Sequence, residues 1–280
     1  MILLSKLIDS VFRTESKFNL EYTLFSGQSF VWSEAPDTKK YFMGIIGNTL
    51  LVLHETEPGT ILVSCTAETI NGLSINEFLT WYFSLDIDVN TVFSKQFMSE
   101  FNDVWKLTEP FTGVRIMRQD PFEIMVTFMC AQGIGMHLIR RQVSMIGERY
   151  GEMLVLDTEN GKMVFHSFPS PSVLASANPD ELARCSNNNR TRAANIIAMA
   201  RAFESGEPAF ACVGSGACPL ETLRETLCKH NGIGLKIADC IALFGLGRFD
   251  AFPIDTHVKQ YLWEWFGIEA ARHCLTKKNY

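Results

Sequence analysis

One lysine stands where its amine could do chemistry. Lys236 follows the glycine-rich segment Asn231-Gly232-Ile233-Gly234 and begins an otherwise apolar segment. It could be an exposed residue of a first helical turn, or a desolvated amine that acts as a reactive group. Cys240 follows four residues later, so a helix would place both side chains on the same face.

A second set of candidate residues lies in the segment AFPIDTHV, residues 251–258. Pro253 predicts a rigid loop that leads into a helix, and Asp255 could cap that helix through its carboxylate. For an aspartate considered alone, this cap is a simpler explanation than catalysis. A lysine after a glycine hairpin, a Pro-x-Asp and the nearby His257 are more specific together.

The two glycines before the lysine indicate how it is positioned. Gly232 and Gly234 permit positive φ angles and a close approach of backbone to a ligand. This suits a helix–hairpin–helix, whose free N–H groups at a helix start can hold a DNA phosphate without reading its sequence. A tight turn between two core helices is the alternative.

The surrounding pattern predicts an α+β protein. Short aromatic or β-branched runs with glycine or polar breaks, among them FSGQSFVW (25–32), indicate strands up to about residue 65. Helical spacing then dominates, and one long apolar stretch runs from Pro121 to Gly151. We expect a β-rich N-terminal domain over residues 1–108 and a helical body over residues 109–280. Further helices are expected near residues 92–105, 192–206, 219–230 and 235–247, and residues 170–185 are expected to form two short helices, the second beginning at Asn178-Pro179-Asp180.

Composition limits the function classes. No apolar run approaches the roughly 18 residues of a membrane span, and the N-terminus resembles no signal peptide. The eight cysteines form no CxxC pair and no iron–sulfur spacing, so we expect no metal site and no cofactor. An intracellular protein with reduced thiols is expected, in the cytoplasm or nucleoid, or in the nucleus of a eukaryote.

The charge distribution is uneven. The net charge is −6, yet residues 1–100 hold 6 basic against 12 acidic residues, so the acidic excess lies in the first third. The segment from Arg184 to Arg201 contains four arginines and no acidic residue. A polyanion could therefore meet a local basic face on a protein that is acidic overall.

Three segments carry a resemblance to a known family. They are GIGLKIADCIALFGLGRFDAFPIDTHV (232–258), TLFSGQSFVW (23–32) and GVRIMRQDPFE (113–123). The chain resembles the 8-oxoguanine DNA glycosylase/AP lyase family, within the helix–hairpin–helix–GPD base excision repair superfamily, over nearly its whole length. The resemblance implies a monomeric enzyme that acts on damaged double-stranded DNA and has no membrane partner.

The resemblance implies the chemistry of two residues. Lys236 occupies the position of the nucleophile that attacks C1′ of the damaged nucleotide, expels the base and leaves a Schiff base, which promotes β-elimination. This requires a neutral amine, and at the ordinary lysine pKa of about 10.4 only roughly one amine in a thousand is neutral near pH 7.4. Asp255 resembles the aspartate that stabilises oxocarbenium-like charge on the sugar.

The resemblance also implies residues of the base pocket. Gly27 would offer its carbonyl to the N7–H that 8-oxoguanine has and guanine lacks. Cys240 would pack on one face of the flipped base, Phe244 would line the pocket and Pro253 would shape the sugar loop. For Cys240 and Phe244, ordinary core packing is the alternative. His257 matches a histidine near the 5′ phosphate.

Two segments depart from the family pattern. The family places an Asn-Asn-Asn run in the gap left by the flipped base, but here Gly133, Ile134 and Gly135 occupy those slots. Leu138 stands in place of an arginine that reads cytosine, so we expect weak or absent specificity for an opposite cytosine. Arg192 matches the intercalating arginine of a second DNA-facing loop. The chain ends at CLTKKNY, where the family continues into a pocket-closing helix, so a truncated C-terminal end and an open pocket are expected.

Two other functions remain open at this point. One is a glycosylase of the same superfamily for another damaged purine, such as an alkylpurine. The other is a non-catalytic lesion-binding protein, which the missing wedge and the missing C-terminal helix would suit. Lys236 argues against a purely monofunctional enzyme, since relatives that use water lack it.

Overall fold

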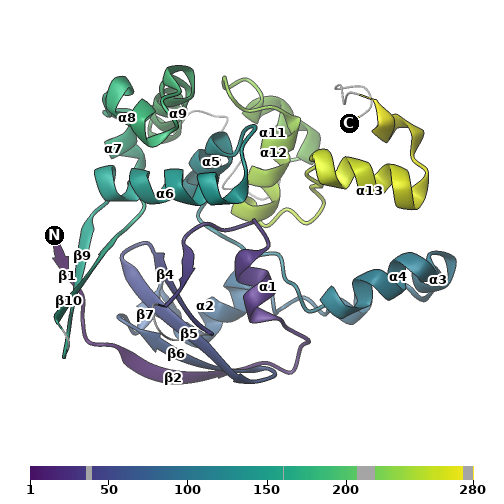
Figure 1. Cartoon of the computed structure of the whole chain (residues 1–280), viewed down its shortest axis with the longest axis horizontal. Coiled ribbons are helices and arrows are strands. Elements are labelled where there is room, and N and C mark those ends of the chain that lie inside the picture. The colour runs from purple at the N-terminus through teal and green to yellow at the C-terminus, as the bar shows by residue number, and fades with distance from the viewer. Residues whose placement is uncertain (36–39, 160, 207–217, 274–279) are drawn as a thin grey trace.

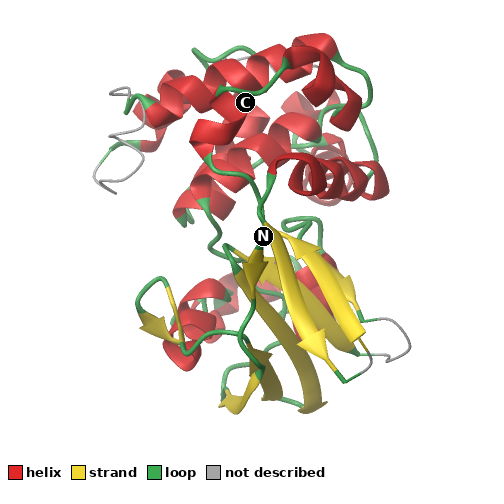
Figure 2. Ribbon diagram, turned by 90° about the vertical axis from the view of Figure 1, so that its left-hand side faces the viewer, coloured by secondary structure: helices red, strands yellow, loops and turns green. Residues whose placement is uncertain are grey.

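The computed structural model describes residues 1–35, 40–159, 161–206, 218–273 and 280. A half built on an antiparallel sheet lies below a helical half (Figure 1), and the view turned by 90° separates strands and helices in the same way (Figure 2). The predicted α+β class is therefore confirmed. Among the residues described, no helix has the length and apolar character needed to cross a membrane.

The N-terminal half is built on a five-stranded antiparallel sheet, in which side chains alternate between a buried and an exposed face. Leu51, Leu53, Ile61 and Val63 are fully buried and form the centre of its core. Two helices, α1 (Leu20–Phe25) and α2 (Ile75–Tyr82), pack against this buried face. The strands, in sheet order, are β2 (Ile8–Arg13), β6 (Thr60–Cys65), β5 (Thr49–Glu57), β4 (Tyr41–Ile46) and β3 (Trp32–Glu34).

The segment that the sequence predicted as a strand around residues 25–32 is mostly not a strand. Helix α1 ends at Phe25, and only Trp32 of this run belongs to β3. The Asn19 side chain accepts a hydrogen bond from the Tyr22 N–H and so begins the helix. Gly27, at φ +88°, lies in the turn that follows.

The predicted helix near residues 92–105 is two short helices, α3 (Lys95–Glu100) and α4 (Asn102–Thr108). They meet at Phe101, whose φ of −113° and ψ of 46° are not helical. The remaining short elements of this half are β7 (Thr69–Ile70), β8 (Leu73–Ser74), η1 (Val89–Thr91) and η2 (Glu109–Phe111).

The helical half is centred on α5 (Pro121–Cys130), which is buried along nearly its whole length. The apolar stretch 121–151 begins and ends where predicted, but it is interrupted. Gly133 takes φ +70° and Gly135 is extended, so α6 (Met136–Tyr150) begins after a break. The other helices are α7 (Pro171–Ala175), α8 (Pro179–Cys185), α9 (Arg190–Glu204), α11 (Leu220–Leu227), α12 (Leu235–Cys240), η3 (Ile241–Gly245), α13 (Thr256–Phe266) and η4 (Glu269–Arg272).

A second sheet was not predicted. Strands β9 (Met153–Thr158) and β10 (Gly161–His166) form a hairpin within the helical half, and β1 (Ile2–Leu3) pairs in parallel with β9. The first residues of the chain thus pair with the helical half rather than with the five-stranded sheet. The division into residues 1–108 and 109–280 stays a prediction.

Among the residues that the structure describes, one cysteine departs from expectation. Cys218 is disulfide-bonded, so the expectation that all thiols are reduced is wrong there. Cys65, Cys130, Cys185 and Cys240 carry free thiols.

Candidate active site

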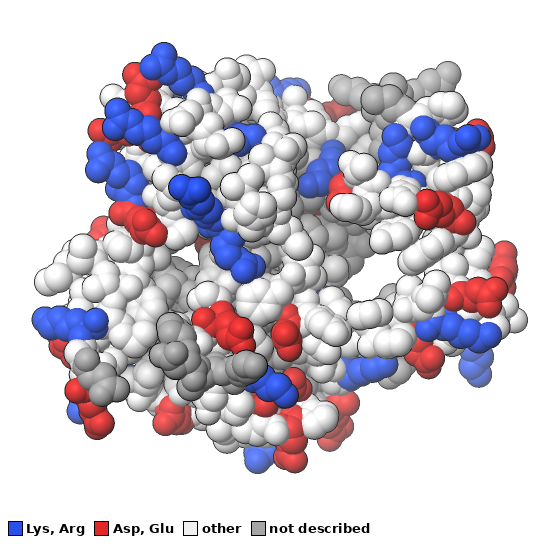
Figure 3. Space-filling view, in the orientation of Figure 1, with Lys and Arg blue, Asp and Glu red and all other residues white. Residues whose placement is uncertain are grey.

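A cavity of about 720 Å³ lies between the two halves of the protein. Its lining comes from the turn after α1, from α5 and α12, and from the loop that precedes α13. The space-filling view shows the surface hollowed along this boundary (Figure 3). Of the residues that the sequence singled out, Gly27, Lys236, Cys240, Phe244, Pro253 and Asp255 all line the cavity.

The glycine hairpin places Lys236 at the start of α12. Gly232 takes φ +88°, and a Cβ there would lie 3.1 Å from the Asn195 amide nitrogen and 3.3 Å from the terminal carbon of Met129. A side chain at this position would therefore be both strained and crowded. Gly234 is extended and is the N-cap of α12. Lys236 thus enters the cavity from a fixed backbone.

Lys236 is half-buried among aromatic and sulfur groups. Its ammonium nitrogen lies 5.2 Å from the centroid of the Phe128 ring, within range of a cation–π interaction. Phe128 in turn stacks on Phe244, with centroids 5.5 Å apart and an angle of 16° between the rings. The lysine therefore faces the wall of a largely apolar chamber.

Cys240 shares one helix face with Lys236, as predicted. Burial raises the pKa of the Cys240 thiol to about 12, and the charge and hydrogen bond of Lys236 only partly oppose this. The thiol therefore stays protonated near neutral pH, and its sulfur acts as an apolar surface rather than as a competing nucleophile.

Asp255 is the N-cap of α13. Its Oδ1 accepts a hydrogen bond of 2.8 Å from the Val258 N–H, so the cap expected for this residue is present. The same carboxylate also faces the cavity that contains Lys236. Both residues lie in the described part of the chain, and no ion pair within 4.0 Å joins them. Asp255 therefore combines a structural bond with a place beside the reactive space.

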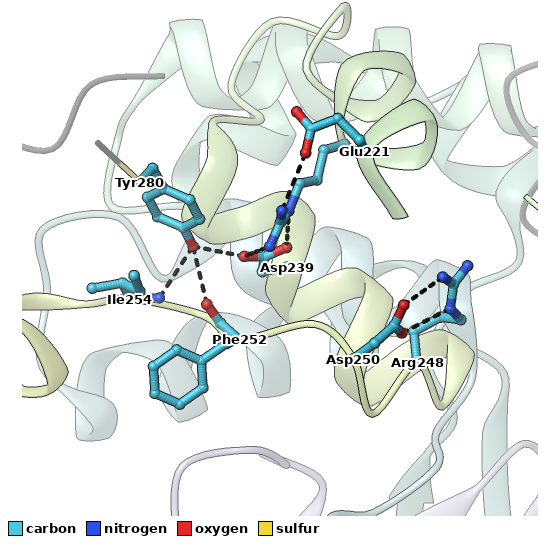
Figure 4. Close-up of polar contacts among 8 residues, drawn as sticks. Glu221, Asp239, Arg248, Asp250, Phe252, Ile254 and Tyr280 are labelled. Atoms are coloured by element: carbon cyan, nitrogen blue, oxygen red, sulfur yellow. Dashed lines mark hydrogen bonds and ion pairs between the residues drawn. The ribbon is translucent and has the colours of Figure 1, made fainter. Parts of the chain in front are cut away.

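A buried charge cluster fixes the helix that carries Lys236 (Figure 4). Asp239 is 0% exposed, and its two oxygens accept hydrogen bonds of 2.7 and 3.0 Å from Arg224 of α11. The Tyr280 hydroxyl donates to Asp239 at 2.8 Å and accepts from the Ile254 N–H at 3.1 Å. These bonds tie α12 to the loop immediately before Asp255.

Sequence reasoning missed this cluster. One signal was available, because Asp239 stands in the apolar run IADCIALF, where a charged residue requires a buried partner. Its partners Arg224 and Tyr280 are 15 and 41 residues away in the chain, so only the folded arrangement reveals them.

On the opposite wall, Gln28 holds the turn that contains Gly27. The buried Gln28 amide donates to the Arg115 carbonyl at 2.7 Å, and its Oε1 accepts from the Met117 N–H at 2.7 Å. The Gln119 amide donates to the Gln28 carbonyl at 2.8 Å. These bonds join segments 23–32 and 113–123, two of the three segments that carried the resemblance, and they fix the Gly27 backbone.

The predicted DNA-facing residues have different surroundings. A Cβ at Gly133 would meet no atom within 4 Å, so this backbone is open, and His257 is exposed in the first turn of α13. Arg192 is only 8% exposed and donates to the Gln132 carbonyl at 3.0 Å and to Gln142 at 3.4 Å. Two of its guanidinium nitrogens are thus engaged by the segment that follows α5 and by α6. The roles of all three in DNA binding stay predictions.

The described ranges contain no group of three or more His, Cys, Asp or Glu side chains arranged to hold a metal ion.

Two family descriptions match the chain. Residues 10–125 match the 8-oxoguanine DNA glycosylase N-terminal domain, and residues 138–279, just over half of the chain, match the HhH-GPD superfamily base excision DNA repair protein. The N-glycosylase/DNA lyase of Saccharomyces cerevisiae is 27% identical over 93% of this chain and 72% of its own length. The N-glycosylase/DNA lyase OGG1 of Arabidopsis thaliana is 26% identical over 95% and 71%.

Solved structures agree in fold. MBOgg1 in complex with a low-affinity DNA ligand has a TM-score of 0.79 at 24% identity, over 96% of this chain and 86% of that one. The Clostridium acetobutylicum 8-oxoguanine glycosylase/lyase, in complex with double-stranded DNA containing cytosine opposite 8-oxoguanine, has a TM-score of 0.78 at 22% identity, over 99% and 90%.

Proposed function

The chain belongs to the HhH-GPD superfamily of base excision DNA repair proteins, and from this premise we propose that it is a bifunctional 8-oxoguanine DNA glycosylase/AP lyase. The observation that carries the proposal is the placement of Lys236. This primary amine lies in a cavity of about 720 Å³ that also contains Asp255 and the Gly27 turn. Such a chamber can take one extruded base and its sugar.

The proposed reaction begins at the amine of Lys236. Its neutral nitrogen attacks C1′ of the extruded nucleotide, the C1′–N9 bond breaks with its electron pair leaving on the base, and the nitrogen loses a proton. The sugar ring opens to give an imine between Lys236 and C1′. Loss of a C2′ proton then expels the 3′ phosphate by β-elimination. The carboxylate of Asp255 stabilises positive charge on the sugar during the attack.

The proposed recognition of the base uses the opposite wall. The Gly27 carbonyl accepts a hydrogen bond from N7–H of 8-oxoguanine, which guanine cannot offer. A buried polar group left without its partner costs about 1–3 kcal/mol. The hydrogen bonds of Gln28 hold the turn in place. When guanine occupies the pocket, the Gly27 carbonyl therefore cannot easily rotate to find another partner, and its lost hydrogen bond disfavours guanine. Cys240 and Phe244 supply apolar surface for the faces of the base.

The charge distribution suits a DNA partner. On the face shown in Figure 3, Lys and Arg side chains run from the upper left of the helical half down to its boundary with the lower half. Acidic side chains gather on the lower half, beneath that boundary. Duplex DNA would approach the basic part of this boundary, over the cavity. A DNA repair enzyme acts where DNA is stored, so an intracellular location is part of the proposal.

Borohydride trapping tests the proposed function. A duplex containing 8-oxoguanine opposite each of the four bases is incubated with the protein and borohydride, alongside undamaged and abasic duplexes. We expect a covalent protein–DNA complex on the 8-oxoguanine and abasic duplexes, and none in Lys236→Gln. The matched control is Lys229→Gln, since this lysine of the same hairpin region is exposed and lies outside the cavity lining. At saturating protein it should trap as the unaltered chain does.

Each outcome has a distinct meaning. Trapping on the abasic duplex alone would establish a reactive lysine with a pocket for another damaged purine. Binding to the lesion without trapping on any duplex would favour a non-catalytic lesion-binding protein. Equal trapping by Lys236→Gln and the unaltered chain would remove Lys236 from the nucleophile position.

A further inference from the structure

Gln119 bonds to two opposite walls of the base cavity. It is only 6% exposed and immediately precedes the N-cap of α5, where the chain has passed from the lower half into the helical half (Figure 1). Its side-chain amide donates a hydrogen bond of 2.8 Å to the Gln28 carbonyl, next to Gly27. Its backbone N–H donates one of 2.8 Å to the Phe244 carbonyl. A single residue therefore joins the turn that carries Gly27 to the helix that carries Phe244.

The bond to Phe244 is made where a helix leaves an acceptor free. Phe244 lies in the last turn of η3, and carbonyl groups at a helix end have no partner within the helix. Gly245 follows, and a Cβ there would lie 3.1 Å from the Pro121 Cα and 3.4 Å from the Ile124 Cβ. A side chain at this position would be crowded, so the glycine lets η3 pack closely on the first turn of α5. This close packing keeps the Phe244 carbonyl within reach of Gln119.

The two bonds of Gln119 fix a spacing that matters for recognition. In the proposed function the Gly27 carbonyl accepts N7–H of the base, while Phe244 lines the space that the base enters. These two groups come from different halves of the chain, and a hydrogen bond weakens steeply when its angle departs from the optimum. A small shift of one wall against the other would therefore weaken the bond to N7–H and still leave room for a base.

We propose that Gln119 is a positioning residue that sets the Gly27 carbonyl against the Phe244 wall and so controls recognition of the damaged base. This inference rests on the proposed glycosylase function and adds a specificity-determining residue that does not itself line the cavity. Gln119 acts through Gln28. With the Gln28 carbonyl held, the preceding peptide group, which contains the Gly27 carbonyl, cannot rotate freely. An abasic site has no base to recognise, so Gln119 should have little effect on β-elimination.

Two variants remove the bond to Gln28, and a third controls for stability. Gln119→Met keeps the length of the side chain without a donor, and Gln119→Asn keeps the amide but shortens its reach. The matched control is Thr66→Val, because the Thr66 hydroxyl accepts a hydrogen bond of 3.0 Å from the buried Leu50 N–H, in the same half and outside the cavity lining. Gln119→Met and Thr66→Val each leave one buried backbone group without its partner, so their losses of stability should be similar.

The decisive measurement is affinity for two duplexes that differ in a single donor. One contains 8-oxoguanine, and the other contains 8-oxo-7-deazaguanine, which has carbon in place of N7 and so lacks the N7–H. Affinities are measured in the Lys236→Gln background, in which we expect no cleavage. Single-turnover excision of 8-oxoguanine and β-elimination on an abasic duplex are measured for the same variants with Lys236 intact. Circular dichroism checks that each variant is folded.

We expect Gln119→Met and Gln119→Asn to bind the 8-oxoguanine duplex about tenfold more weakly, and the 7-deaza duplex within about threefold of the background protein, because the bond at stake is missing there. Excision at subsaturating protein should fall by about the same tenfold factor, with β-elimination within about threefold. Thr66→Val should stay within about threefold in every assay, because its lost bond lies away from the base.

Three results would overturn the positioning role and leave the proposed function standing. One is unchanged affinity and excision in both Gln119 variants. Another is an equal loss of affinity for the two duplexes, because a general distortion of the cavity would weaken both. The third is a background protein that binds the two duplexes equally, since the Gly27 carbonyl would then read no donor that Gln119 could position. If the unaltered protein excises no 8-oxoguanine, the proposed function and the role of Gln119 both fail.

Discussion

Two aspartates of this protein have similar partners and very different surroundings (Figure 4). Asp239 is paired in two bonds with Arg224, and Asp250 is paired in two bonds with Arg248 at 2.9 and 2.7 Å. The side chain of Asp239 is 0% exposed, whereas that of Asp250 is 54% exposed. Replacing each aspartate by alanine therefore compares a buried with an exposed arginine–carboxylate pair, and the buried one also loses the hydrogen bond from the Tyr280 hydroxyl.

The expected losses of stability differ severalfold. Removing one partner of a buried ion pair costs about 3–5 kcal/mol, because the remaining charge is left without compensation. Arg224 is 20% exposed and keeps an ion pair of 3.2 Å with Glu221, so we expect Asp239→Ala to be at the lower end, about 3 kcal/mol. Asp250→Ala removes an exposed pair, which is worth about 0–1 kcal/mol.

Chemical denaturation followed by circular dichroism measures both variants. At equal slopes, the difference between the midpoints multiplied by that slope gives the difference in the free energy of unfolding. We expect Asp239→Ala to lower that free energy by about 2 kcal/mol more than Asp250→Ala does. Equal losses for the two variants, or a loss below about 1 kcal/mol for Asp239→Ala, would refute the argument from burial.

Two further predictions concern a carboxyl group and a hydroxyl. Burial, and then the charge of Asp120, raise the pKa of Glu123 to about 8, so its contribution to stability is full below its ordinary pKa of 4.5 and is lost as the pH rises through 8. Glu123→Gln should therefore raise the melting temperature relative to the unaltered protein more at pH 8.5 than at pH 5, and an equal change at both would contradict this. Tyr280→Phe removes the hydroxyl that joins Asp239 to the Ile254 N–H, so we expect a loss of about 1 kcal/mol in denaturation. Slower single-turnover excision should accompany that loss. If stability and excision are both unchanged, the hydrogen bonds of the Tyr280 hydroxyl do not help to position α12 and the loop before Asp255.

Local chemistry made several features readable from the sequence. Glycines at positive φ, prolines at first helical positions and polar N-caps act through their nearest neighbours, so they mark the same turns and helix ends in the chain as in the fold. The hairpin at Gly232, the start of α5 at Pro121 and the cap at Asp255 were predicted on this basis. The shared face of Lys236 and Cys240 follows equally from helical spacing.

Periodicity was less reliable where a few residues interrupt it. The apolar stretch 121–151 has helical spacing throughout, yet Gly133 and Gly135 break it into α5 and α6. The hairpin of β9 and β10 escaped notice because its short strands were surrounded by helical patterns. Sequence reasoning identified the glycines of the break but not their effect on the helix.

The sequence by itself predicted the lysine as a candidate reactive group, the glycine hairpin before it, the helix cap at Asp255 and the α+β class. Each of these follows from residue types and interactions between residues close in the chain. Only the tertiary structure decided that Lys236 and Gly27 face one cavity, since they come from opposite halves of the chain. It also buried Arg192 and paired Asp239 with Arg224 and Tyr280. Burial and long-range pairing depend on how whole elements pack, and no local pattern of residue types specifies that packing.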